Sequence, residues 1–135
     1  MERAEAAVDA YQENQARWGA RDFDHALPGG ESGHRFWERY TGALRQVAAV
    51  YAEDATVAVV SHGAEIRVFS ILAAGLAPAT REDRPLFNTG MVTLTGHPDH
   101  GWELTSWISE PIGGTHLLGD VRHDVTADST ADAAV

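Results

Sequence analysis

The sequence predicts an α/β fold in which helices pack on a short mixed β-sheet. Three observations predict it: apolar residues recur at helical spacing in the first fifty residues, an apolar β-branched run follows, and two β-rich segments flank a turn-forming stretch. A chain of 135 residues has room for one domain with one core. We expect residues 1–117 to belong to that domain and residues 118–135, rich in Asp, Thr and Ala, to form a disordered tail.

Two amphipathic helices are predicted before the apolar run. The first covers residues 3–18, and the second begins after Leu27-Pro28-Gly29-Gly30 with Ser32 as its expected N-cap. Their core-facing positions share a spacing of three or four residues. These positions are Ala4, Ala7, Val8, Tyr11, Gln15 and Trp18 in the first helix, and Phe36, Tyr40, Ala43, Leu44, Val47 and Tyr51 in the second.

The β-branched run predicts a strand over residues 56–60, followed by a helix over 64–74 that ends at Gly75. The segments 87–95 and 102–108 predict a hairpin, because the connection Gly96-His97-Pro98-Asp99-His100-Gly101 is dense in turn formers. The large side chains of the tryptophans are expected in or against the core. They are Trp18, Trp37, Trp102 and Trp107.

Composition narrows the function. The formal net charge is −10 and every basic residue is arginine, which argues against a nucleic-acid partner or an anionic membrane surface. The absence of cysteine excludes disulfides, thiolate metal sites and a cysteine nucleophile. No apolar run is long enough to cross a bilayer and no signal-peptide core is present, so we expect a cytoplasmic protein without a membrane partner. A small phosphorylated substrate is compatible with this net negative charge, because its binding needs only a local positive site.

His62 is the strongest functional candidate. It lies between Ser61 and Gly63, on a turn that joins the predicted strand to the next helix, and the free N–H groups at a helix start attract anions. The alternative is a structural histidine that caps its helix or makes a core hydrogen bond. Ser61 and Gly63 either stabilise the turn or contact a ligand, and both interpretations stay open.

For four further residues a purely structural role is an alternative to a role in the site. Glu31 and Ser32 either begin a helix, which we favour, or orient an arginine of the site. Arg39 and Arg67 are expected to make structural ion pairs.

His97 and His100 have a spacing found in metal sites, but they lie on a predicted hairpin tip with no further ligands beside them. We therefore predict no metal and no cofactor.

The apolar run poses a physical problem. A strand that is apolar at every position is typical of one buried on both faces of a parallel sheet, and a parallel partner needs its own strand and crossover. Nothing ahead of Thr56 is predicted to be a strand. Either the first helices are misassigned, or the chain is the second part of a larger α/β domain.

A resemblance favours the second explanation. Gly29-Gly30-Glu31-Ser32 with Arg39, Val59-Val60-Ser61-His62-Gly63 with Ile66-Arg67, Asn88, and Thr115-His116-Leu117 stand in an order that resembles the C-terminal half of the histidine phosphatase superfamily, the phosphoglycerate-mutase-like branch. The resemblance implies an incomplete three-layer fold and phosphoryl transfer through a phosphohistidine.

In the family an Arg-His-Gly motif supplies the attacking histidine. Two arginines and a second histidine hold the phosphoryl oxygens, and an acidic residue protonates the leaving group. By motif, His62 matches the second histidine, which makes it the catalytic candidate. The resemblance places Ser61, Gly63, Glu31 and Ser32 around the phosphate.

The sequence departs from the family in lacking Arg-His-Gly, and neither Glu2 nor Glu5 matches the family's acid. His25 and His34 lack the nucleophile's motif. We therefore expect a truncated domain that is inactive alone on its small phosphorylated substrate, with phosphatase and mutase outcomes both open. The alternative is a non-catalytic interaction or pseudo-phosphatase fragment that needs a complementary chain or forms a homo-oligomer through an exposed sheet edge.

Overall fold

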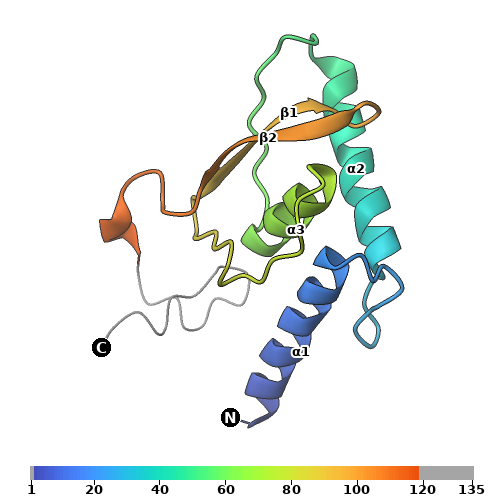
Figure 1. Ribbon diagram of the computed structural model, residues 1–135, viewed down its shortest axis with the longest axis vertical. Coiled ribbons are helices and arrows are strands. Elements are labelled where there is room, and N and C mark those ends of the chain that lie inside the picture. Colours follow the sequence, from blue (N-terminus) through green and yellow to red (C-terminus); the bar gives the residue numbers. More distant parts are fainter. Residues whose placement is uncertain (1, 119–135) are drawn as a thin grey trace.

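The computed structural model describes residues 2–118 and shows an α/β mix of helices with a two-stranded antiparallel sheet. Figure 1 shows the hairpin above α3, with α2 rising along one side of both and α1 below them. Apart from Leu118, the predicted tail lies outside the described residues. The elements in chain order are α1 (Glu2–Gly19), α2 (Gly33–Val50), α3 (Gly63–Ala73), β1 (Met91–His97), β2 (Gly101–Ile108) and a 3₁₀ turn (Thr115–Leu117).

The start of α2 confirms the predicted cap. Ser32 has extended backbone dihedrals, and its Oγ accepts a hydrogen bond from the Arg35 N–H at 3.3 Å. A Cβ on the next residue, Gly33, would lie 2.8 Å from both Phe23 Cα and Trp18 Cδ1. The glycine therefore lets α2 begin directly against α1 and the loop between them.

The core is a set of aromatic contacts that joins the three helices. Trp18 of α1 stacks on Phe36 of α2 with ring centroids 5.1 Å apart, and Trp37 stacks on Phe69 of α3 at 5.3 Å. Phe69 also meets the edge of Trp102 on β2 at 6.5 Å. The predicted placement of these tryptophans is thus confirmed, and α3 carries the residue on which the helices and the hairpin converge.

The first half of α1 is less buried than its apolar spacing predicts. Ala4 and Ala7 are exposed, whereas Gln15 and Trp18 near the helix end are buried. Among the described residues, α1 makes its main helix contact with α3 through that second half. The apolar spacing thus predicts the helix correctly but overestimates how much of it is covered.

The hairpin is confirmed with a shorter first strand. Predicted from residue 87, β1 begins at Met91 because residues 87–90 form a turn: Gly90 N–H bonds the Phe87 carbonyl, and Thr89 has a φ of 63°. A bulge follows Thr93, which pairs with Ser106 while the next residue pairs with Leu104.

The predicted strand at 56–60 and the mixed sheet are wrong for the described part of the chain. Residues 51–60 are all exposed, with Val57 at 39%, Val59 at 49% and Val60 at 95%. The segment contains a turn at residues 52–55 and connects α2 to α3 without joining the sheet (Figure 1). A strand needs a hydrogen-bonded neighbour, and residues 2–118 supply none for it.

Candidate functional site

His62 is the N-cap residue of α3. Its backbone is extended, its carbonyl accepts the Ile66 N–H at 2.9 Å, and its side chain is exposed and makes no capping bond. One face of α3, which includes Val68, Phe69 and Leu72, is buried in the core. The helix start is therefore fixed by the packing of α3 behind it, while the His62 side chain is exposed.

A polar cluster ties this turn to α2. Arg39 donates to both carboxylate oxygens of Glu31, at 2.6 and 3.2 Å, and its Nη2 lies 3.4 Å from Glu65 Oε1. Glu65 Oε2 accepts from Ser61 Oγ at 3.2 Å. These contacts bring together three segments of the chain, the loop before α2, α2 itself and the turn into α3. The hydrogen bond to Glu31 is the main reason that the pKa of Arg39 is raised.

The cluster decides what the neighbouring residues do locally. Ser32 caps α2, as favoured from the sequence, and Glu31 forms an ion pair with Arg39. The expected structural ion pair of Arg39 is present, and it is shared with Glu65.

Tyr40 anchors the same cluster in the core. Its ring packs on Phe69 at 4.7 Å, and its side chain hydrogen-bonds with that of Ser61. Burial disfavours the phenolate, which raises the pKa of Tyr40 above its ordinary value. Ser61 is therefore held from two helices, by Tyr40 of α2 and by Glu65 of α3.

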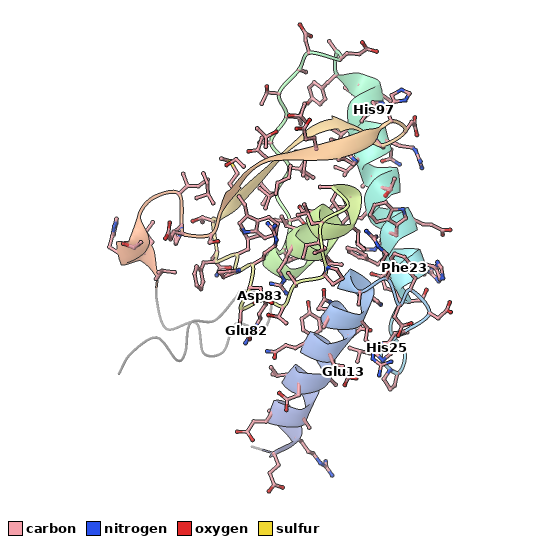
Figure 2. All side chains as sticks on the ribbon, in the orientation of Figure 1. Glu13, Phe23, His25, Glu82, Asp83 and His97 are labelled. Carbon is pink, nitrogen blue, oxygen red and sulfur yellow. The ribbon has the colours of Figure 1, made fainter. Side chains whose placement is uncertain are left out.

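The remaining histidines lie elsewhere. Figure 2 shows His25 on the loop that follows α1, and its Nδ1 lies 2.6 Å from Asn14 Oδ1. His34 pairs with Asp24 at 3.0 Å. At the hairpin tip His97 accepts the Asp99 N–H, and its ring lies 5.1 Å from that of His100. Within residues 2–118 no group of three or more His, Asp or Glu side chains is arranged to hold a metal ion.

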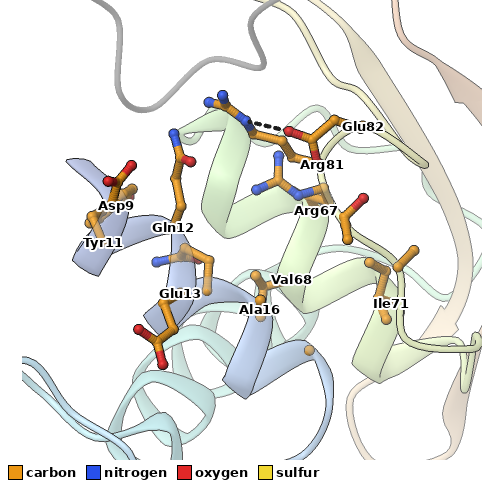
Figure 3. A pocket seen from close by; sticks show the side chains of 14 residues that line it. Asp9, Tyr11, Gln12, Glu13, Ala16, Arg67, Val68, Ile71, Arg81 and Glu82 are labelled. Carbon is orange, nitrogen blue, oxygen red and sulfur yellow. Dashed lines mark ion pairs between the residues drawn. The ribbon is translucent and has the colours of Figure 1, made fainter. Parts of the chain in front are cut away.

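One hollow lies apart from the His62 turn. It has a volume of about 300 Å³ and opens between α1, α3 and residues 79–82. Figure 3 shows the buried Arg67 and the neighbouring Arg81 on its walls, with the Arg81–Glu82 ion pair at 3.5 Å. None of its lining residues belongs to Ser61-His62-Gly63.

Among the described helices, none has the length and apolar character needed to cross a membrane.

Sequence reasoning missed Glu65 and Tyr40. The four-residue spacing from Ser61 to Glu65, across the first turn of a predicted helix, is a signal that was available. The Arg39–Glu65 contact spans 26 residues, and no local pattern announces it. Only the packing of α2 against α3 brings these side chains together.

The chain is similar to one curated protein, the PE-PGRS family protein PE_PGRS11 of Mycobacterium tuberculosis (strain ATCC 25618 / H37Rv). The two are 28% identical over a stretch that covers 71% of this chain and 19% of the relative, so the chain spans about a fifth of the relative's length. No solved structure matches the chain significantly. The family model of the histidine phosphatase superfamily (branch 1) matches residues 1–110, which include the whole His62 turn and its polar cluster. The chain therefore belongs to the histidine phosphatase superfamily.

Proposed function

We propose that this chain carries the second-histidine half of a phosphoryl-transfer site, in which His62 binds the phosphoryl group of a small phosphorylated substrate. The observation that carries the proposal is that His62, the N-cap residue of α3 in a member of this superfamily, is exposed and its side chain makes no capping hydrogen bond. The first N–H groups of a helix and its dipole favour an anion at that place. Ser61 and Gly63 shape the turn, Ser32 begins α2, and Glu31 holds Arg39, which contacts Glu65 beside the turn.

The attacking histidine belongs to a segment that this sequence does not contain, since no Arg-His-Gly is present. In the proposed reaction that histidine forms a bond to phosphorus as the bond to the leaving oxygen breaks, and water or a second substrate oxygen then takes the phosphoryl group. His62 would donate a hydrogen bond to a phosphoryl oxygen and so stabilise the charge that develops there. Alone, residues 1–117 form an incomplete part of the domain and are inactive.

The extended segment at 56–60 supports this incompleteness. Its residues are exposed, and the run from Val57 to Val60 is apolar at each position, as in a strand covered on both faces. We propose that the missing portion pairs with this segment on both sides and completes a three-layer fold. The strand would then end at Ser61, and its paired neighbour would deliver the nucleophile beside His62.

The test compares the 135-residue chain with a form extended upstream through a segment bearing Arg-His-Gly, assayed on an aryl phosphate. We expect background hydrolysis from the chain alone and activity from the extended form. His62→Ala in the extended form should lower kcat by about 100-fold, the scale of removing one charge-stabilising donor. His100→Ala at the exposed hairpin tip is the control and should leave the rate unchanged.

Two results would count against the proposal. Robust hydrolysis by the 135 residues alone would refute the half-site, and full activity of the extended His62→Ala form would refute the role of His62. The second candidate function is a non-catalytic portion that binds a complementary chain or another copy, favoured by the exposed valines and the open edges of the hairpin. An extended form that assembles stably yet hydrolyses nothing would support it.

A further inference from the structure

The turn that carries His62 has firm contacts on one side only. Behind Gly63 the chain enters α3, whose residues Val68 and Phe69 are buried in the core. Ahead of Ser61, residues 51–60 are exposed and belong to no described sheet. The position of the imidazole relative to α2 therefore depends on whatever holds the turn itself.

Glu65 makes the contacts that do so. Its two carboxylate oxygens are divided between partners: Oε2 accepts from Ser61 Oγ at 3.2 Å, and Oε1 lies 3.4 Å from Arg39 Nη2. Arg39 is in turn held by Glu31, at 2.6 Å. Glu65 thus links the residue next to His62 to a guanidinium on another helix, and its side chain is only 27% exposed.

The charge of the cluster excludes a simpler role for Glu65. Two carboxylates face one guanidinium, so the cluster has one excess negative charge and on electrostatic grounds repels a phosphoryl group. A carboxylate beside an anion site opposes binding unless it contributes something other than charge. The divided contacts of Glu65 supply such a contribution, namely a fixed geometry for the turn.

We infer that Glu65 is a positioning residue for His62: by bridging Ser61 and Arg39, it fixes the turn into α3 against α2 and so holds the imidazole where a phosphoryl group binds. This inference rests on the proposed function of His62. Tyr40 supports the arrangement, since it bonds Ser61 while its ring packs on Phe69. The sequence assigns no such role to Glu65.

The test uses the isotope-labelled 135-residue chain and inorganic phosphate as the probe, followed by NMR at His62. Loss of negative charge alone would tighten phosphate binding, whereas loss of positioning weakens it. We expect Glu65→Ala to weaken binding about fivefold, the scale of one net hydrogen bond. Glu65→Gln keeps an acceptor for Ser61 and should fall between. Glu38→Ala removes the same charge from an exposed site on α2 and should not weaken binding.

Backbone relaxation gives a second measurement that needs no ligand. In the unaltered chain Ser61, His62 and Gly63 should have order parameters of about 0.85, and Glu65→Ala should lower them toward about 0.6 while the buried residues 68–72 of α3 stay rigid. Unchanged order parameters together with equal or tighter phosphate binding in Glu65→Ala would overturn the inference. If phosphate fails to shift His62 even in the unaltered chain, the proposed function fails, and the relaxation data alone decide the role of Glu65.

Discussion

The aromatic core and the connecting segment at 51–60 both contain large apolar side chains, but only those of the core are buried. Phe36 and Phe69 are 1% and 3% exposed, because rings from α1, α2 and β2 surround them. Val60 is 95% exposed, and Val57 and Val59 are 39% and 49% exposed. Hydrophobic character alone therefore does not bury a residue. Burial requires a second surface, which the first region finds within the chain and the second does not.

This contrast also shapes the candidate site, because His62 lies where the two regions meet. On its C-terminal side α3 is fixed by the core, and on its N-terminal side the chain is uncovered. The polar cluster of Ser61, Glu65 and Arg39 stands at that junction. Substitutions on the two sides should consequently have very different costs.

The largest expected effect is on the core. Phe36→Ala removes the ring that stacks on Trp18 and should lower the free energy of unfolding by about 3–5 kcal/mol. Val60→Ala should change it by less than about 0.5 kcal/mol, because the side chain is already in water. Urea titrations followed by tryptophan fluorescence measure both. A large cost for Val60→Ala would show that the segment is covered in solution.

A smaller effect is expected at the start of α2. Ser32→Ala removes the acceptor for the Arg35 N–H and should cost about 1 kcal/mol. Thr56→Ala removes a hydroxyl from the exposed segment and serves as the control, with no measurable cost. The same urea titrations apply. Equal costs would mean that the extended segment has a structural partner as specific as the helix cap.

The smallest effect concerns pH. Burial raises the pKa of Tyr40 above about 10, so the folded state holds this proton more tightly than the unfolded state does. The stability that Tyr40 contributes is complete below pH 10 and is lost as the pH rises through the folded-state pKa. Tyr40→Phe should reduce this alkaline loss, measured by unfolding at several pH values. An identical alkaline profile in that variant would contradict the assignment.

Local patterns predicted the elements whose partners are close in sequence. Ser32 and Gly75 mark helix ends by their own backbone chemistry, and the hairpin follows from a turn-forming stretch between two β-rich segments. The strand at 56–60 was mispredicted because pairing depends on another segment, however strong the local preference is. Phe87 was placed in a strand by composition, whereas residues 87–90 form a turn and β1 begins only at Met91.

The sequence by itself determined the helices, the hairpin, the family and the place of His62 on a turn before α3, because these follow from spacing and from an ordered set of motifs. The tertiary structure decided which apolar residues are covered and which side chains surround the turn. Arg39 reaches Glu65 across 26 residues only because Tyr40 and Phe69 pack α2 against α3. The physical reason is that burial and ion pairing are properties of two surfaces meeting, and a single stretch of sequence specifies only one of them.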